Sequence, residues 1–360
     1  MFLLSLKITK EGMEGNLRTT AMGIMPHRDI ERALELALSL DIPFFPQLPN
    51  VSFYEDMYAQ VSAGFPGISL DVEGEKVLFS REKFEAELED YFERMEEEDP
   101  FRLRPPYSVV YHRFLEQDLS GCSAIRGQVT GPVSFGFRVL DEELRPIIYD
   151  DEVRGVLFDF IRRKVNVMFK ELRARNENAF VWIDEPGLGW VFSGFSGYND
   201  GLAKEELRDF FSGVEGIKGM HLCAEVGLPY LLDLGLEILS FDAYQMGELP
   251  PRHAPAVAEF LRGGGVISWG VVPTEPAWLE KESAKSLAER VSQYFEVIAQ
   301  TTGLVEEEIV RGSLLAPARC CVRITEPGSG LYRSEEQAVE TAFKLLKEVS
   351  LILKERYHLN

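Results

Sequence analysis

The chain has 360 residues, and its 59 Asp and Glu against 38 Lys and Arg give a formal net charge of -21. This excess of negative charge excludes nucleic acid as a natural partner, because phosphate binding needs clustered Lys and Arg. No run approaches the roughly 18 apolar residues of a membrane span, and the apolar residues 1–6 are too few for a signal-peptide core. Four cysteines, two of them adjacent, do not make a disulfide framework. We therefore expect a cytoplasmic protein with no membrane partner.

Short apolar runs alternate along the chain with longer segments of helical periodicity. The eight predicted strands span residues 17–23, 42–46, 124–130, 180–183, 218–223, 237–242, 266–272 and 313–316. The predicted helices include residues 29–40, 151–175, 204–211, 254–261, 284–300 and 335–354. This alternation predicts an α/β fold. Eight strands without a Gly-rich dinucleotide fingerprint favour a (β/α)8 TIM barrel over an open doubly wound sheet.

Residues 50–120, between the second and third predicted strands, are too many for a single crossover. They contain two short β runs, residues 67–73 and 76–79, and a long acidic helix. The Glu73-Gly74-Glu75 turn that joins the two runs is typical of a β-hairpin. We interpret residues 50–120 as an insertion over the barrel mouth, and the whole chain, residues 1–360, as one domain.

A His-x-Cys pair in the fifth predicted strand carries the strongest chemical signal. Because His221 and Cys223 are two residues apart, both side chains would point to one face of the strand and could bind one metal ion. Asp242 ends the next strand, and Cys320 and Cys321 follow the last one. Nitrogen and sulfur ligands with a carboxylate nearby suit zinc best. The alternative is ordinary packing, since free cysteine is among the most buried residue types.

Other polar residues would meet this pair. Asp184 and Glu185 close the fourth predicted strand. Active sites of TIM barrels lie at the C-terminal ends of the strands, so residues distant in sequence converge on one mouth. The nearby aromatic residues either wall such a site or pack the core. They are Trp182, Trp190, Phe192, Phe195 and Tyr198.

Several motifs, in one order and spread over nearly the whole chain, carry a family resemblance. They are Thr130-Gly131-Pro132, Ile183-Asp184-Glu185-Pro186, His221-Leu222-Cys223, Leu239-Ser240-Phe241-Asp242 and the proline-preceded Cys320. Together they resemble the catalytic barrel of cobalamin-independent methionine synthase. More broadly, the chain resembles the superfamily that contains this synthase together with the uroporphyrinogen decarboxylases and the zinc enzymes that methylate thiols from corrinoid proteins.

The resemblance implies a zinc cofactor. Its ligands would be His221, Cys223 and either Cys320 or Cys321, and Asp242 stands where the family often has a glutamate ligand. The side chain of Asp242 is one methylene shorter, so it either reaches the metal through water or does not bind it.

The resemblance also implies the activity, which is methyl transfer to a zinc-activated small thiol. Asp184 would contact the amino group of a homocysteine-like substrate, with Glu185 beside it as a second catalytic carboxylate, and Gly23 would bind substrate. Gly23-Ile24 departs from the family's Gly-Ser, so homocysteine itself is not fixed as the thiol. Residues 263–276 lack the histidine that protonates a folate leaving group, which favours a methylated corrinoid protein as donor and partner.

Two other functions stay open. A uroporphyrinogen decarboxylase-like enzyme shares the fold, but Arg18 and Arg28 are a poor substitute for the arginine cluster that holds propionates. The other is a non-catalytic corrinoid- or thiol-binding relative that keeps the metal and has lost turnover.

Overall fold

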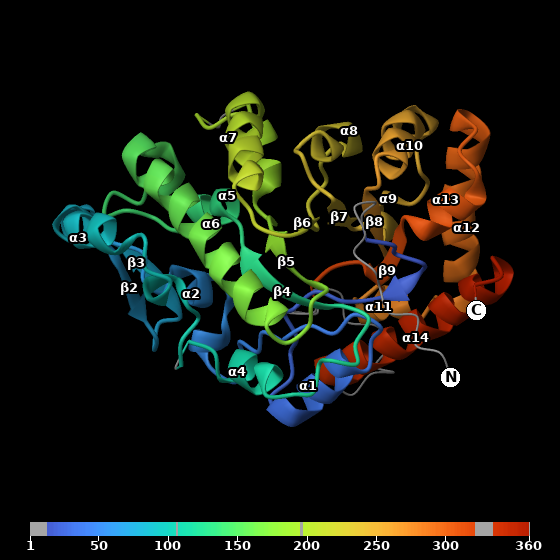
Figure 1. The fold of residues 1–360 in the computed structure, drawn as a ribbon, viewed down its shortest axis with the longest axis horizontal. Coiled ribbons are helices and arrows are strands. Elements are labelled where there is room, and N and C mark those ends of the chain that lie inside the picture. The colour runs from blue at the N-terminus through green and yellow to red at the C-terminus, as the bar shows by residue number, and fades with distance from the viewer. Residues whose placement is uncertain (1–12, 106, 195–196, 321–333, 360) are drawn as a thin grey trace.

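A curled parallel sheet forms the centre of the protein, and helices surround it (Figure 1). The computed structural model describes residues 13–105, 107–194, 197–320 and 334–359. Within these ranges seven strands form the sheet, in the order β1-β9-β8-β7-β6-β5-β4. They are β1 (Arg18–Thr19), β4 (Ile125–Thr130), β5 (Ala179–Asp184), β6 (Lys218–Leu222), β7 (Ile238–Phe241), β8 (Val266–Val272) and β9 (Ser313–Pro317).

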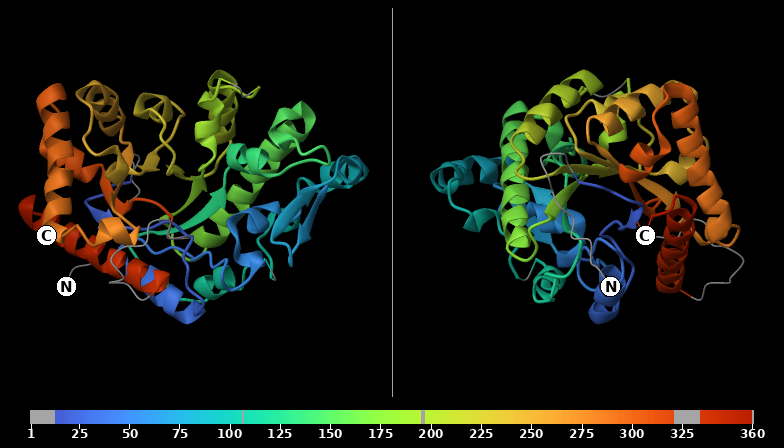
Figure 2. Two further views of the ribbon diagram at one scale, coloured as in Figure 1. Left: turned by 180° about the vertical axis from the view of Figure 1, so that it is seen from behind. Right: turned by 45° about the vertical axis from the view of Figure 1, so that its right-hand side comes forward.

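The helices lie on the outer side of the curled sheet, as two further views show (Figure 2). The α-helices are α1 (Ile30–Leu38), α2 (Met57–Ser62), α3 (Arg81–Arg94), α4 (Val109–Leu115), α5 (Pro132–Arg138), α6 (Asp151–Arg173), α7 (Asp200–Ser212), α8 (Leu228–Leu232), α9 (Ala243–Met246), α10 (Ala254–Arg262), α11 (Pro276–Leu279), α12 (Ala284–Thr302), α13 (Glu306–Arg311) and α14 (Glu335–Arg356). Short 3-10 helices are η1 (Phe53–Glu55), η2 (Asp99–Phe101), η3 (Ile147–Tyr149), η4 (Leu188–Phe192) and η5 (Pro251–His253). None of the described helices combines the length and apolar character that crossing a bilayer requires.

Both faces of the sheet are buried, as expected when helices cover a parallel sheet. Every residue of β4, β5 and β8 is buried. Because successive side chains point to opposite faces, each strand contributes to two apolar clusters. One cluster unites inner-face residues of successive strands, including Ala124, Phe180, Ile238 and Val266. The alternate residues pack outwards with the helices. This division assigns the inner face for every strand that carries a candidate site residue.

Residues 42–46 do not form the predicted second strand. Ile42 N donates to Thr19 O of β1 at 3.0 Å, and Arg126 N of β4 donates to Pro43 O at 2.9 Å. The segment therefore lies between the two edge strands and makes single bridges instead of a ladder. Pro43 has no N–H to continue a ladder. The structure thus shows a seven-stranded half-barrel with an irregular connection at its edges, and a closed eight-stranded barrel stays a prediction.

The other predicted strands of the sheet are confirmed. The largest difference is β1, which covers only Arg18–Thr19 of the predicted residues 17–23. Leu17 has a φ of 57°, in the left-handed region, so the extended backbone begins only after it.

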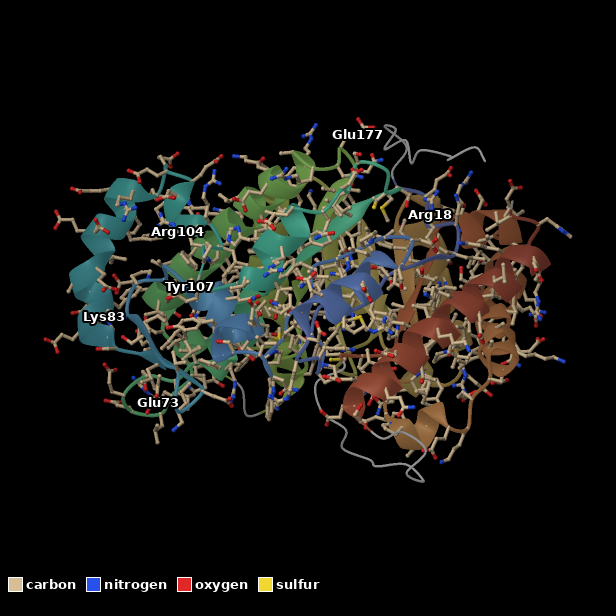
Figure 3. The ribbon with its side chains drawn as sticks, turned by 90° about the horizontal axis from the view of Figure 1, so that it is seen from below. Arg18, Glu73, Lys83, Arg104, Tyr107 and Glu177 are labelled. Carbon is tan, nitrogen blue, oxygen red and sulfur yellow. The ribbon has the colours of Figure 1, made fainter. Side chains whose placement is uncertain are left out.

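The hairpin predicted within residues 50–120 is present. Strand β2 (Ile68–Asp71) pairs antiparallel with β3 (Lys76–Phe79), and the acidic helix α3 follows. Phe65 packs this unit on α6, with its ring 5.3 Å from that of Phe160. Glu73 and Lys83 lie at one end of the molecule, far from Arg18 (Figure 3). An insertion over the barrel mouth, and a single domain, stay predictions.

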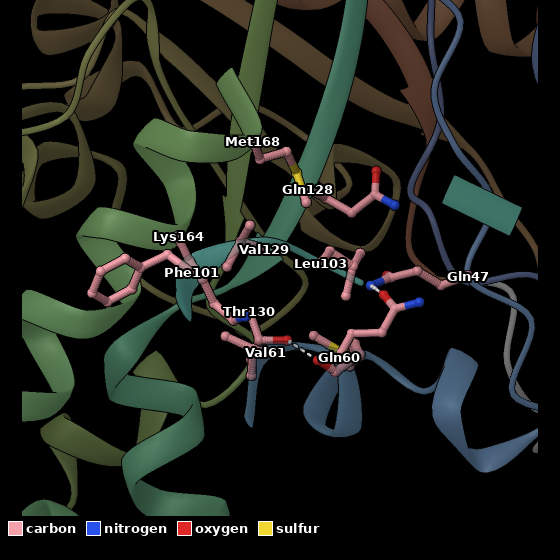
Figure 4. Close-up of a pocket in the computed structure, with 11 residues that line it drawn as sticks. Gln47, Gln60, Val61, Phe101, Leu103, Gln128, Val129, Thr130, Lys164 and Met168 are labelled. Carbon is pink, nitrogen blue, oxygen red and sulfur yellow. Dashed lines mark hydrogen bonds between the residues drawn. The ribbon is translucent and has the colours of Figure 1, made fainter. Parts of the chain in front are cut away.

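A small cavity between α2, β4 and α6 contains a buried lysine. Its volume is about 20 Å³, room for about one water molecule. Gln47 and Gln60 line it and share a hydrogen bond of 2.8 Å (Figure 4). Lys164 donates to Ala63 O at 2.9 Å, and burial lowers the pKa of its ammonium to about 7. The cavity is too small to hold a substrate.

Replacing Lys164 with methionine should stabilise the fold at pH 7. The pKa of Lys164 falls from 10.5 to about 7 on folding, so between these values the unfolded chain binds more protons and stability rises with pH. We expect Lys164→Met to raise the free energy of unfolding by roughly 2–4 kcal/mol at pH 7, and by less at pH 10. Urea unfolding at both pH values measures this, with Lys170→Met on the exposed face of the same helix as control. An equal gain in the free energy of unfolding at the two pH values would contradict a lowered pKa of Lys164 in the folded protein.

Candidate metal centre

A row of buried polar residues crosses the inner face of five adjacent strands. In the register of the sheet, Thr130 pairs with Asp184, Asp184 with His221, His221 with Ser240, and Ser240 with Ser268. All five are buried. Residues in register on parallel strands point to the same face and are lateral neighbours. The sequence therefore builds a continuous polar row inside a largely apolar half-barrel.

Three potential metal ligands meet at this row. One ligand atom each from His221, Cys223 and Cys320 lies within 4.8 Å of the others. His221 lies on β6 and Cys223 directly follows it, whereas Cys320 follows β9. Ligand atoms at about 2.0–2.3 Å from a tetrahedral zinc ion lie roughly 3.3–3.8 Å apart, so the three atoms would have to approach one another by up to about 1 Å to hold a metal. The structure thus brings together three of the residues that the sequence analysis named as candidate ligands.

The environment of His221 fits a metal ligand. Its Nδ1 lies 2.9 Å from Ser240 Oγ, while its buried Nε2 has no hydrogen-bond partner among the described residues. The tautomer that donates from Nδ1 to Ser240 leaves the lone pair on Nε2. Metal-binding histidines are usually oriented in this way by a hydrogen bond from the other ring nitrogen. A donor set of one imidazole and two thiols suits zinc.

Cys223 is prepared to carry a negative charge. A hydrogen bond from Cys320 contributes most to lowering the pKa of the Cys223 thiol, and His221 and Arg319 lower it further despite burial. The thiolate is the form that binds metals.

Replacing Ser240 with alanine should weaken metal binding without removing a ligand. Loss of the partner that orients His221 should cost about 10- to 100-fold in zinc affinity. The matched control is Ser268→Ala, because Ser268 is equally buried and pairs with Ser240 in the sheet, but its Oγ makes no described hydrogen bond. Competition with a chelator of known affinity measures both variants. Equal affinities in the two would show that Ser240 does not support the site.

Asp242 is engaged elsewhere. Its carboxylate accepts from Gln245 N, at the start of α9, at 2.8 Å and from Arg319 Nε at 2.7 Å. It is not part of the group of three ligands. By binding Arg319, Asp242 fixes the residue immediately before Cys320. Whether Asp242 reaches a metal through water stays untested, and the geometry gives it a role in holding the loop that carries Cys320.

Asp184 lies on the inner face of β5, beside His221 in the register. Burial raises the pKa of its carboxyl to about 6, although the charges of His221 and Arg126 lower it. Its Oδ1 has no hydrogen-bond partner among the described residues. An acceptor in this state next to the candidate ligands can bind a donor group of a substrate.

Glu185 has a structural task. Its carboxylate accepts from Val133 N at 3.0 Å, and from Ser134 N and Oγ at 2.7 and 2.6 Å. A Cβ on Gly131 would come within 2.1 Å of the Glu185 carboxylate, so glycine is required there. The Thr-Gly-Pro and Asp-Glu-Pro motifs therefore form two halves of one contact that fixes the start of α5. The predicted catalytic role of Glu185 stays untested.

The remaining predicted residues are distributed as follows. Gly23 lies against the Gln128 side chain, whose Nε2 would be 2.2 Å from an added Cβ. Cys321 and Phe195 lie outside the described residues. Trp182 is fully buried, and its ring is stacked on that of His221 at 6.1 Å and 14°. Trp190, by contrast, is 66% exposed.

Two contributors were missed in the sequence. Ser240 lies within the quoted Leu239-Ser240-Phe241-Asp242 motif, but its contact with His221 joins residues 19 apart and depends on the register. Arg126 is fully buried inside a strand that is otherwise apolar or uncharged. An arginine in a strand predicted to be buried on both faces was the available signal.

Comparison with known proteins gives a structural likeness. The chain matches no protein-family model and no curated protein in sequence. A methyltransferase from Methanosarcina mazei has a TM-score of 0.50 at 15% identity, over 90% of this chain and 86% of that chain. A B12-independent methionine synthase from Shewanella sp. W3-18-1, in complex with selenomethionine, has a TM-score of 0.45 at 13% identity. That match covers 66% of this chain and 64% of the length of the synthase. The Methanosarcina match shows a shared fold.

Proposed function

We propose that the protein is an enzyme of methyl transfer that methylates the sulfur of a small thiol at a zinc site. The observation that carries this is the convergence of His221, Cys223 and Cys320, with the buried Nε2 of His221 lacking a partner among the described residues. The superfamily indicated by the sequence motifs supports it, as does the fold shared with a methyltransferase.

The ligand count agrees with catalysis. Structural zinc sites usually have four protein ligands, whereas catalytic sites have three and leave a position for substrate. Zinc bound by His221, Cys223 and one more cysteine would lower the pKa of a substrate thiol and thereby supply a thiolate at neutral pH. Two cysteine thiolates would offset the ionic charge, so that the substrate sulfur keeps its nucleophilicity.

The protein's own groups would bind and orient the substrate. Asp184 would accept a hydrogen bond from a donor group such as an amine, and Ser240 would hold His221 in its orientation. The polar row beside the metal position is buried, whereas Cys223 and Cys320 are partly exposed. The S–C bond forms as the bond between methyl and donor breaks, the electron pair stays on the donor, and the thiol proton leaves to solvent.

A methylated corrinoid protein is the proposed donor and partner. Protonation of a folate nitrogen would need a general acid, and residues 263–276 contain no histidine. We expect methylation of thiols from a panel to be faster with methylcobalamin than with methyltetrahydrofolate by about a hundredfold, the usual contribution of such an acid.

The assay uses metal-analysed protein with both donors, and Cys223→Ser as the inactive control. A rate with methyltetrahydrofolate equal to that with methylcobalamin would overturn the donor assignment. Absence of methyl transfer with every thiol and both donors, in protein that retains zinc, would favour the non-catalytic alternative.

A further inference from the structure

Arg126 places a guanidinium group inside the half-barrel. It lies on β4 two residues after Ala124, a member of the inner apolar cluster, so its side chain shares that face. The residue is fully buried. Its Nε donates to Thr20 Oγ1 at 3.1 Å, and its Nη1 donates to Gln128 Oε1 at 3.0 Å. Its Nη2 has no hydrogen-bond partner among the described residues.

The positive charge of Arg126 is not neutralised by an ion pair in the part of the chain that the structure describes. Its acceptors are a hydroxyl, a side-chain amide and the carbonyl of Gly127, all of them uncharged. Burial lowers the pKa of the guanidinium to about 9, so it remains charged at neutral pH. A buried charge without a counterion is costly, and native proteins usually pair one.

Aromatic rings hold the guanidinium in position. Its Cζ lies 4.1 Å from the centroid of the Trp182 ring and 5.0 Å from that of Phe44. These cation–π contacts stabilise the charge and fix the planar group, yet they leave the Nη2 hydrogens unused. A preorganised, unpaired guanidinium is a receptor for a carboxylate or a similar oxyanion, which it can bind through charge-assisted hydrogen bonds.

Arg126 borders the same interior as the candidate metal centre. Trp182 contacts both, since its ring also stacks on His221. The charges of Asp184 and Cys320 act on Arg126 and raise its pKa against the effect of burial. Gln128, which fixes Nη1, also packs against Gly23. Trp182 therefore links the guanidinium directly to the residue that would bind the metal.

We propose that Arg126 is an anion-binding residue, and that the thiol methylated by this protein carries a carboxylate or sulfonate that pairs with Arg126 Nη2. The position of the sulfur rests on the proposed function. The anion subsite does not, because it follows from the buried and unpaired guanidinium alone.

Calorimetric titration of the zinc-loaded, full-length protein tests the proposal. Two matched pairs of probes have the same chain length and differ in the terminal group, which is a charged carboxylate or a neutral alcohol: 3-mercaptopropionate against 3-mercaptopropanol, and 6-mercaptohexanoate against 6-mercaptohexanol. We expect at least one anionic thiol to bind about 10- to 100-fold more tightly than its alcohol, as for a hydrogen bond to a charged group. Equal affinities within both pairs in the wild-type protein would overturn the subsite, and this comparison needs no variant.

Two substitutions assign the effect to Arg126. Arg126→Met should abolish the preference for the anionic thiol and leave the affinity for the alcohol unchanged, whereas Arg126→Lys should keep part of the preference. A variant that weakens both probes equally would show a role in packing only and would contradict the proposal.

Hexanoate, which has no thiol, separates the subsite from the proposed function. Binding of hexanoate that is lost in Arg126→Met would support the subsite even if no thiol is methylated. Methylation of charged and neutral thiols with equal efficiency would instead reject the subsite and leave the proposed function standing.

Discussion

Replacing Cys223 with serine should remove most of the zinc from the purified protein. We expect about one zinc ion per chain in the wild type and a drop in affinity of more than about 100-fold in the variant, because losing a direct ligand should exceed the effect of losing a supporting hydrogen bond. Contact with Cys320 and His221 lowers the pKa of the Cys223 thiol, which favours the thiolate form that binds metals. Elemental analysis of the purified proteins measures the metal content.

Cys122→Ser is the matched control for this experiment. Cys122 is a partly buried cysteine that packs against the outer apolar cluster and is not in the ligand group. It should keep its full zinc content. A Cys223→Ser protein with as much zinc as the wild type would mean that the metal is bound elsewhere or that the three residues are a packing cluster.

Alanine substitutions of the two adjacent cysteines should differ sharply. Cys320 contributes its Sγ to the group with His221 and Cys223, and it packs against the inner apolar cluster. Cys321 lies outside the described residues, and its expected behaviour rests on the sequence alone: adjacent residues at a strand end should point to opposite faces, so only one of the two cysteines should face the metal. We expect Cys320→Ala to lose zinc as severely as Cys223→Ser, and Cys321→Ala to retain it.

Metal analysis and thermal unfolding of both proteins check this expectation. The unfolding curves serve as the control for intact folding. Equal zinc losses from Cys320→Ala and Cys321→Ala, with folding preserved, would contradict the assignment of the third ligand, and loss from Cys321→Ala alone would reverse it.

Much of the sheet could be predicted because its strands are buried on both faces. In a chain where helices alternate with them, continuous apolar runs such as Val266–Val272 indicate strands of a parallel sheet, and β8 has these bounds. The prediction of a second strand was wrong, because the apolar pattern of the segment does not take account of its proline. Residues 42–46 are apolar, but Pro43 donates no hydrogen bond, so the segment bridges β1 and β4 without a ladder.

The candidate metal centre could also be predicted only in part. The i, i+2 spacing of His221 and Cys223 is a local property of a strand, and the convergence of strand ends follows from the alternation of strands and helices. Asp184 could be placed beside them for the same reason. The sequence could not reveal that Asp242 binds Arg319 or that Glu185 fixes the start of α5, because both contacts join residues far apart in the chain.

By itself, the sequence determined most strands of the sheet, the shared face of His221 and Cys223, and the residue types that could bind a metal. These follow from periodicity and from ligand chemistry, which act over a few residues. Only the tertiary structure decided the partners: the register that sets Ser240 against His221, the approach of Cys320 from β9, and the unpaired charge of Arg126. Partners depend on how strands distant in sequence are aligned, and that alignment is fixed by the packing of the whole sheet and its helices.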